Sequence, residues 1–218
     1  MAAATGWIDS ANQALKRVPV VPLYFIALIP AVAMFWAALS GTGGADPVRA
    51  LETGLGSWAL KFMLASLAVT PLRERVGLNM LRFRRMIGLT AFFYAVLHFS
   101  VWIVFDRQLQ WAQIAVDLTK RPWIIAGMTA LVLLLVLAVT SNDRMVARLG
   151  AARWRMLHRL AYLAAAAIIL HYLWLVKSWT AEPLAYAAIT VLLLGYRLLP
   201  KQRPARARTE RATGRPAA

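Results

Sequence analysis

The sequence predicts an all-α membrane protein, a bundle of six transmembrane helices. Of its 218 residues, 61% are hydrophobic and only 16% are charged, whereas a soluble domain is nearer half apolar and a quarter charged. The apolar residues are concentrated in runs of roughly 17 to 25 residues, the length at which a helix crosses a bilayer. Short connections between the runs favour antiparallel neighbours, so we expect an up-and-down bundle.

Six apolar runs are expected to be the spans, and prolines at positions 71, 122, 183 and 200 suit their starts and stops. The runs cover residues 20–39, 53–70, 87–105, 122–140, 157–176 and 183–199. They define one domain over 20–199, between an N-terminal segment over 1–19 and a basic, disordered tail over 200–218. Lys16 and Arg17 could also begin a signal peptide cleaved after Ala33, but the apolar run continues well past that point, so we expect an uncleaved span.

The basic residues predict the orientation of the bundle. Nineteen of the 25 Lys and Arg residues lie at the N-terminus, between the second and third runs, between the fourth and fifth, or after the sixth. Only six lie in the alternate connections, so the positive-inside rule predicts that both termini are cytoplasmic. The net charge of +16 then needs no nucleic acid as a partner, because the cations cluster between apolar runs and no nucleic-acid-binding module is visible.

Three histidines, His98, His158 and His171, fall within or at the edge of predicted spans, where ionisable residues are costly and usually functional. His98 lies about 12 residues above the inner edge of the third span and His171 about 15 above that of the fifth, or roughly 18 and 22 Å. Two neutral imidazoles at this shared depth would clamp a haem iron between the third and fifth helices. Because the chain has no cysteine, the haem would be non-covalent and of the b type.

His158 lies at the inner edge of the fifth span, and no fourth histidine exists to face it. Arg84 is about 14 residues before His98, which puts it roughly 21 Å lower and near the depth of His158. A guanidinium is a poor iron ligand but a good partner for haem propionates, as are Arg85 and Arg159. The sequence therefore predicts one haem b and leaves a second open: His158 could ligate iron, contact a quinone or support the fold.

His158 and His171 are about 140° apart around an ideal helix. A stack of two haems would therefore require the fifth helix to bend, or the two sites to lie on different sides of it.

Two segments carry a family resemblance. The first is the stretch from Arg84 to Leu89 followed by that from Phe92 to Phe99, and the second is 153–162 followed by His171 and Tyr172. Both resemble the MsrQ (YedZ) family, the haem-binding membrane subunits of periplasmic methionine sulfoxide reductase systems. This family is part of the wider group of ferric-reductase-like transmembrane domains, which includes NADPH oxidases and iron reductases. That group typically has two histidines on each of two haem helices, and here Arg84 stands at the missing position.

The resemblance implies a bacterial inner-membrane protein that passes electrons from the respiratory quinone pool through haem b. The acceptor would be a periplasmic molybdopterin-containing catalytic subunit, which reduces methionine sulfoxide in oxidised periplasmic proteins. The chain itself would be a quinol-oxidising electron-transfer subunit without a catalytic residue of its own. FMN is expected on the resemblance alone, because no phosphate-cradling glycine motif is visible. The stretch after Leu199 is too short for a flavin and NADPH domain, so electrons are expected from quinone or from a separate reductase.

Two other functions stay open. A stand-alone transmembrane ferric or metal reductase would have the same haem core. A proton or metal transporter would also use membrane histidines, but the cores of the predicted spans hold no acidic residue and no inverted repeat is visible. For quinone contacts the sequence offers only Tyr94, Tyr162 and Asp143 as candidates, and the position of Tyr94 four residues before His98 favours a packing role.

Overall fold

The structure, a computed structural model, describes residues 2–176 and 180–199, and this part of the chain is entirely helical. The predicted tail over 200–218 lies outside the described residues. The helices are α1 (Ala2–Arg17), α2 (Val20–Leu39), α3 (Pro47–Pro71), α4 (Arg84–Val101), α5 (Trp111–Lys120), α6 (Pro122–Val139), α7 (Asp143–Leu149), α8 (Ala151–Leu157), α9 (Leu160–Leu175) and α10 (Ala181–Gly195). Short 3-10 or π-helical turns over Leu72–Val76, Leu81–Phe83, Trp102–Asp106 and Tyr196–Leu198 extend α3, α4 and α10.

Six helical segments are long and apolar enough to cross a membrane, which confirms the predicted six-span, all-α protein. They are Val20–Leu39, Pro47–Val76, Leu81–Asp106, Pro122–Val139, Ala151–Leu175 and Ala181–Leu198. The second begins six residues earlier than predicted, because the Asp46 side chain accepts a hydrogen bond from the Arg49 N–H at 3.0 Å and Pro47 occupies the first turn. Glu52 consequently lies in the first turns of this candidate span, just before the predicted core over 53–70.

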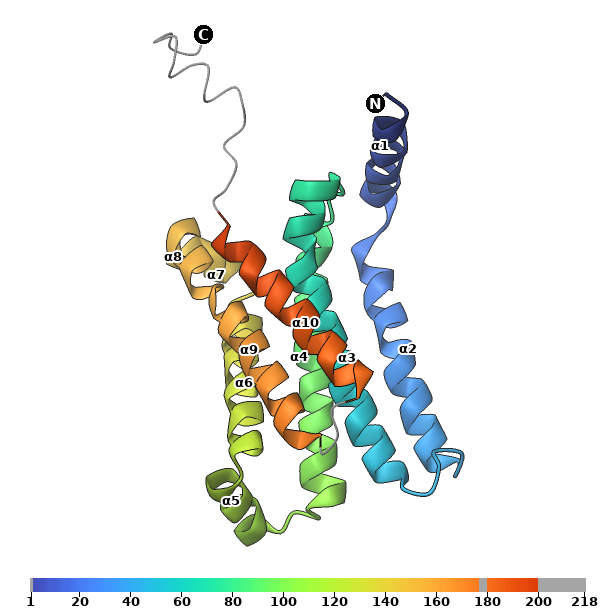
Figure 1. Cartoon of the computed structure of the whole chain (residues 1–218), viewed down its shortest axis with the longest axis vertical. Helices are drawn as coiled ribbons and strands as arrows, with labels where there is room; N and C mark the ends of the chain where they lie inside the picture. The colour runs from blue at the N-terminus through green and yellow to red at the C-terminus, as the bar shows by residue number, and fades with distance from the viewer. Residues whose placement is uncertain (1, 177–179, 200–218) are drawn as a thin grey trace.

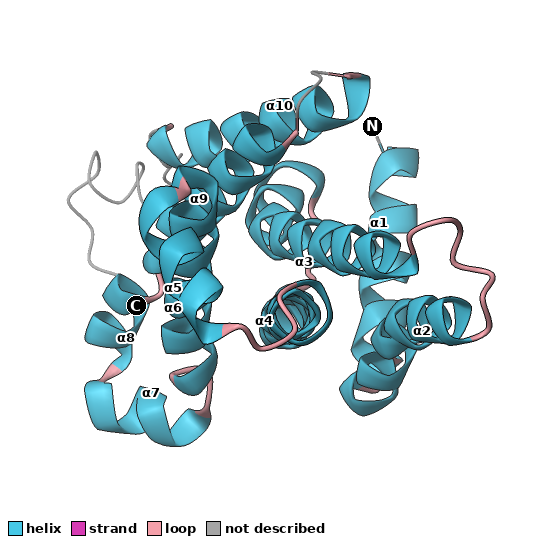
Figure 2. Ribbon diagram, turned by 90° about the horizontal axis from the view of Figure 1, so that it is seen from below, coloured by secondary structure: helices cyan, strands magenta, loops and turns pink. Residues whose placement is uncertain are grey.

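Two antiparallel helix pairs form the centre of the bundle (Figures 1 and 2): α3 packs along α4, and α6 packs along α9. The pairs meet where α4 contacts α6 and where α3 contacts α9, while α10 lies against both α9 and α3. Fully buried Ala164 and Ala165 of α9 belong to the apolar cluster that also holds Leu134 of α6. Small residues of this kind let membrane helices approach closely.

Helix α2 lies at the edge of the bundle (Figure 2) and is joined to it through the Tyr94 hydroxyl. This hydroxyl donates to the Ala27 carbonyl at 2.7 Å and accepts from the Ala31 N–H at 3.1 Å. In a regular helix the Ala31 N–H would bond to the Ala27 carbonyl directly. The hydroxyl is therefore inserted into the backbone ladder of α2 beside Pro30, as can occur at helix distortions. Tyr94 has a structural role, as its sequence position favoured.

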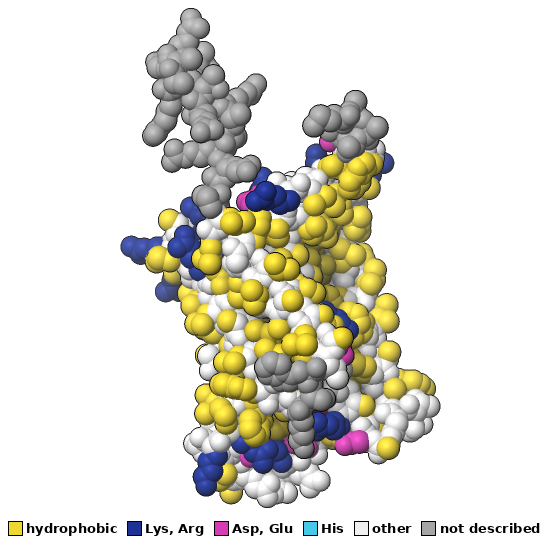
Figure 3. All heavy atoms as spheres, viewed as in Figure 1, with side chains coloured by type: hydrophobic (Ala, Val, Ile, Leu, Met, Phe, Trp, Pro, Cys, Tyr) yellow, Lys and Arg dark blue, Asp and Glu magenta, His cyan; other side chains and the backbone are white. Residues whose placement is uncertain are grey.

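The two ends of the bundle carry different short elements (Figure 1). At one end, the Asn12 side chain of α1 bonds to the Gly77 carbonyl at 3.0 Å and to the Asn79 N–H at 2.8 Å. Helices α7 and α8 lie at this same end, and α5 lies at the other. Apolar side chains cover the surface between the ends, and most of the visible Lys and Arg side chains are near them (Figure 3).

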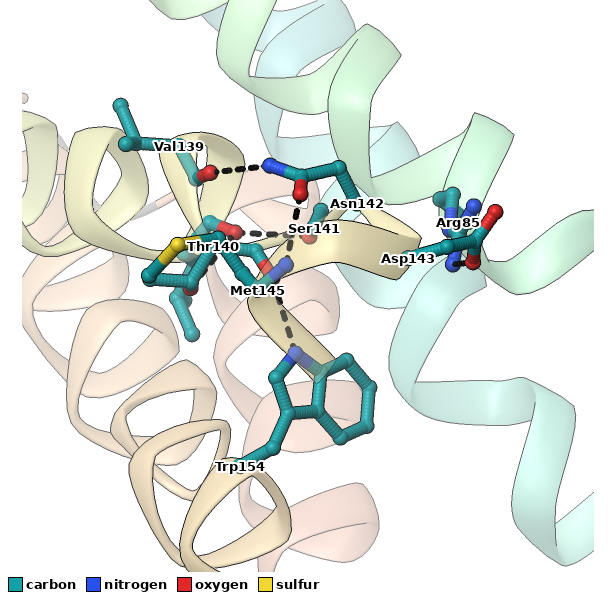
Figure 4. Close-up of polar contacts among 9 residues, drawn as sticks. Arg85, Val139, Thr140, Ser141, Asn142, Asp143, Met145 and Trp154 are labelled. Atoms are coloured by element: carbon teal, nitrogen blue, oxygen red, sulfur yellow. Dashed lines mark hydrogen bonds and ion pairs between the residues drawn. The ribbon is translucent and has the colours of Figure 1, made fainter. Parts of the chain in front are cut away.

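The Arg85–Asp143 ion pair joins α4 to the start of α7, with 2.5 Å between the guanidinium and the carboxylate (Figure 4). The Arg85 guanidinium lowers the pKa of the exposed Asp143 carboxyl. The Asn142 side chain caps α7 by accepting a hydrogen bond from the Met145 N–H at 2.8 Å.

Candidate functional site

His98 of α4 and His171 of α9 meet in the centre of the bundle. Their ring centres are 6.2 Å apart, and the ring planes are inclined by 74°. The two histidines come from different helix pairs, so each pair contributes one imidazole. The structure thus brings together the two histidines that the depth count predicted to share a level.

Each imidazole is fixed by a backbone carbonyl of its paired helix. His98 Nδ1 lies 2.9 Å from the Glu52 carbonyl oxygen of α3, and His171 Nδ1 lies 2.6 Å from the Trp123 carbonyl oxygen of α6. A carbonyl can only accept, so Nδ1 of each ring must donate its proton. The neutral ring then keeps the lone pair on Nε2, which is the tautomer that a metal-ligating histidine needs.

The separation of the two rings suits one metal ion between them. A bond of about 2 Å from the metal to each nitrogen, with about 1.1 Å more to each ring centre, gives roughly 6 Å between the centres. The observed distance is 6.2 Å.

Glycines make room for both rings. A Cβ atom added to Gly127 would lie 2.9 Å from His171 Nδ1, and one added to Gly56 would lie 3.2 Å from His98 Nδ1. Normal contacts between non-bonded heavy atoms are about 3.5–4.0 Å. Each histidine therefore packs directly against a glycine of the neighbouring helix, in a space that a methyl group would fill.

A cavity surrounds the two rings, reaching Leu134 and Ile168 on one side and the end of the bundle that carries α5 on the other. Its walls are mostly apolar and aromatic, and charged residues lie at the α5 end, as is common for sites that bind large cofactors. The apolar and aromatic lining is Ala59, Ala95, Phe99, Trp102, Trp123, Ile124, Met128, Ala130, Leu131, Leu134, Ile168 and Leu175, and the charged lining is Arg49, Glu52, Asp106, Arg107 and Arg121.

The ligand set is incomplete for a bare metal ion. Within residues 2–176 and 180–199, no group of three or more His, Cys, Asp and Glu side chains is placed to hold one. Protein-bound zinc usually has three or four protein ligands. Two neighbouring imidazoles are instead suited to iron that is already held by a porphyrin, which needs few further ligands from the protein.

His158 lies apart from this pair, at the break between α8 and α9. Its Nε2 is 3.2 Å from the Thr140 hydroxyl, and its ring stacks on Trp154 at 3.9 Å between centres. The Trp154 indole also donates to the Thr140 carbonyl at 2.8 Å (Figure 4). The predicted span is thus interrupted at His158, so the ideal-helix angle between His158 and His171 does not apply.

The three arginines predicted to bind propionates do not line the cavity between His98 and His171. The placement of Arg84 opposite His158 stays a prediction of the depth count. Arg85 pairs with Asp143, and Arg159 is exposed. Any role of these residues at an inner site stays a prediction.

Sequence reasoning missed the charged residues at the α5 end of the cavity. Arg107 and Arg121 are held by Asp117 of α5, and Glu52 lines the same end. Only the spacing of Asp117 and Arg121, four residues apart, could have signalled a helical ion pair. The pairing of Arg107 with Asp117 depends on the path of the loop between them.

Comparison with known proteins agrees with this architecture. The family profile described as "Ferric reductase like transmembrane component" matches residues 52–181, which include all three histidines. Proteins from Brucella ovis, Brucella canis and Brucella suis, each named "Protein-methionine-sulfoxide reductase heme-binding subunit MsrQ", are 44% identical to the chain over 198 residues. The match covers 91% of this chain and 90% of each relative.

The chain belongs to the MsrQ family. Its transmembrane domain is of the ferric-reductase-like type, and it is a multi-pass membrane protein with six candidate spans. Within the MsrQ family the Brucella relatives are named as haem-binding subunits. Their names mention no flavin, so the expectation of FMN still rests on the sequence resemblance alone.

Proposed function

We propose that this chain is the haem-binding membrane subunit of a protein-methionine-sulfoxide reductase, with one haem b between His98 and His171. The observation that carries the proposal is the pair of imidazoles with ring centres 6.2 Å apart, both with Nδ1 bonded to a backbone carbonyl. The names of the MsrQ relatives support haem as the group that this pair would hold.

The residues of the chain have defined tasks at this site. His98 and His171 would hold the iron through their Nε2 atoms, and the Glu52 and Trp123 carbonyls fix their tautomer and orientation. Gly56 and Gly127 allow each ring to approach the neighbouring helix. The apolar walls exclude water from the site, which influences the reduction potential. Haem iron bound here would supply reversible one-electron transfer.

The direction of electron flow is also part of the proposal. Both termini would be cytoplasmic in a bacterial inner membrane, because the basic residues favour that side. The cavity end that carries α5 would then face the periplasm, where a molybdopterin-containing catalytic subunit would accept electrons. The donor would be membrane quinol or a separate reductase. We propose no FMN site.

A second candidate function is a stand-alone ferric or metal reductase. The match to the ferric-reductase-like profile over residues 52–181 favours it, because the same haem core would serve either acceptor. An assay of reoxidation separates the two. Reoxidation of the quinol-reduced protein only when the molybdopterin subunit is added supports the first function, whereas reoxidation by a ferric chelate alone supports the second.

The haem-to-protein ratio tests the site itself. The pyridine haemochrome assay should give about one haem fewer per chain in His98→Ala and in His171→Ala than in the wild type. Gly88→Ala is the control, since its new Cβ would meet only the Ser66 hydroxyl at an ordinary 3.7 Å. Full haem content in both ligand variants, or a wild-type protein without a Soret band, would refute the proposal.

A further inference from the structure

Asp117 holds two arginines at the α5 end of the cavity. Its side chain is 6% exposed, and each carboxylate oxygen contacts a different arginine. Oδ1 lies 2.7 Å from Arg121 Nε, and Oδ2 lies 2.8 Å from Arg107 Nε. The second contact is an ion pair without hydrogen-bond alignment. The loop between Arg107 and α5 contains two consecutive non-glycine residues with left-handed backbone, Gln108 and Leu109, and this tight turn returns α5 to Arg107.

Each arginine contacts Asp117 through Nε, which supplies only one of the five N–H donors of a guanidinium. The other four donors, on the terminal nitrogens, are not used by Asp117. In the part of the chain that the structure describes, the terminal nitrogens of Arg107 and Arg121 make no hydrogen bond or ion pair. Each guanidinium also lies over an aromatic ring that lines the cavity: Arg107 over Trp102 at 5.9 Å, and Arg121 over Trp123 at 5.8 Å. Both guanidinium groups are therefore held in place, and their terminal N–H donors remain available to a ligand in the cavity.

The arrangement directs positive charge toward the cavity. Arg107 and Arg121 line it together with Arg49, whereas Asp117 does not. Two carboxylates, Glu52 and Asp106, also line this end, and Asp106 lies 3.5 Å from Arg107 Nε. The cavity thus combines two imidazoles with fixed, planar donors that suit carboxylate groups.

We propose that Arg107 and Arg121 bind the two propionate carboxylates of the haem, and that Asp117 is the positioning residue that holds both guanidinium groups toward the cavity. This inference rests on the proposed function, since it presupposes haem between His98 and His171. It assigns the propionates to Arg107 in the loop before α5 and to Arg121 between α5 and α6, distinct from Arg84, Arg85 and Arg159 at the other end of the bundle.

The test compares two ligands that differ only in the propionates: haem and haem dimethyl ester, in which both carboxylates are neutral. The full-length protein is produced in haem-deficient cells, placed in nanodiscs and titrated with each ligand while the Soret band is followed. Arg107→Gln and Arg121→Gln should each weaken haem binding by about tenfold, a modest value because Arg121 is partly exposed. They should leave binding of the dimethyl ester unchanged.

Controls separate propionate binding from damage to the fold. Lys120→Gln removes an exposed charge beside Arg121 that does not line the cavity, and it should affect neither ligand. Arg107→Lys keeps the charge without the planar fork, so it should recover part of the loss. Equal weakening of both ligands in the arginine variants, or no weakening of either, would overturn the inference.

Asp117→Asn tests the positioning role by the sign of its effect. Removing a negative charge close to bound propionates would strengthen haem binding if only electrostatics mattered. If Asp117 holds the arginines in place, the substitution should instead weaken haem binding about as much as one arginine variant, with no effect on the dimethyl ester. Tighter haem binding in Asp117→Asn would refute the positioning role.

The pattern of haem binding in the variants distinguishes a wrong propionate assignment from a wrong proposed function. If the wild type binds haem and loses it in His98→Ala and His171→Ala, but the arginine variants do not distinguish haem from its ester, only the propionate assignment is wrong. If the wild type binds neither ligand, the proposed function is wrong, and the propionate assignment with it.

Discussion

Replacing Gly127 with alanine would place a methyl group against the ring of His171. The added Cβ would lie 2.9 Å from Nδ1, 3.1 Å from Cε1 and 3.3 Å from Cγ. Since normal contacts are about 3.5–4.0 Å, the ring must move by about half an ångström. The imidazole cannot move without stretching the 2.6 Å hydrogen bond to the Trp123 carbonyl, so the substitution disturbs the orientation of the ligand itself.

The expected cost follows from that hydrogen bond. Loss of an outer-shell partner of a metal-ligating histidine typically lowers metal affinity by about 10- to 100-fold, and we expect Gly127→Ala to weaken haem binding within that range. The helix itself should gain about 0.5–1 kcal/mol, because alanine favours a helix interior over glycine. The prediction is therefore weaker haem binding in a protein whose helices are intrinsically no less stable.

Alanine substitutions at two further glycines should have smaller effects on haem binding. In Gly56→Ala the new Cβ would lie 3.2 Å from His98 Nδ1, so the loss should be smaller than in Gly127→Ala. In Gly88→Ala the nearest atom is the Ser66 hydroxyl at 3.7 Å, an ordinary contact, and haem binding should be unchanged. Haem-to-protein ratio and the low-spin iron signal in electron paramagnetic resonance measure all three variants. Wild-type haem content and spectrum in Gly127→Ala would refute the reasoning.

Three other perturbations have defined outcomes. Tyr94→Phe removes the hydroxyl that bonds to the Ala27 carbonyl and the Ala31 N–H, and it should destabilise the protein by about 1–3 kcal/mol. The expected observation is a lower thermal midpoint with the haem content retained. Loss of quinol oxidation without a change in stability would instead assign Tyr94 to quinone binding. The Asp143 pKa is lowered by Arg85, so the pair stabilises the fold above the ordinary carboxyl pKa, and this contribution is lost as the pH falls through the lowered value. Asp143→Asn should therefore change the free energy of unfolding little below the lowered pKa, whereas near neutral pH the wild type should be more stable by a constant amount. A wild-type advantage that grows as the pH falls would contradict this. His158→Ala should keep the haem between His98 and His171, and a drop of a whole haem equivalent from a wild-type value of two would reveal an inner haem at His158.

The main architecture could be predicted from the sequence because the bilayer imposes a simple rule on it. Runs long enough to cross a membrane are visible directly, and the first and fourth were predicted to within a residue of α2 and α6. The second was predicted too short, because only its apolar run over 53–70 was counted, whereas the Asp46 cap starts α3 six residues earlier. Helices α1, α5, α7 and α8 were missed, since helices at the ends of a bundle lack the apolar length that marks a span.

The pairing of the two histidines could be predicted from the sequence, but the residues around them could not. A rise of 1.5 Å per residue was enough to bring His98 and His171 to one level, since both helices start from the same end of the bundle. The carbonyl partners at Glu52 and Trp123 could not be predicted, because they depend on how far α3 and α6 slide along their neighbours. The same limit applies to Arg107 and Asp117, whose contact depends on a turn through Gln108 and Leu109 that no local sequence preference indicates.

Each of the two histidines is hydrogen-bonded within its own helix pair, so haem binding would affect how the protein assembles in a cell. His98 is anchored on α3 and His171 on α6, so a haem would join two halves that otherwise meet over smaller interfaces. Insertion of the cofactor would then add to the contact between the two halves, and in chains made during iron or haem shortage these smaller interfaces alone would hold the halves together. Such chains would be the preferred substrates of membrane proteases, so the cellular amount of this subunit should follow the haem supply without any change in transcription.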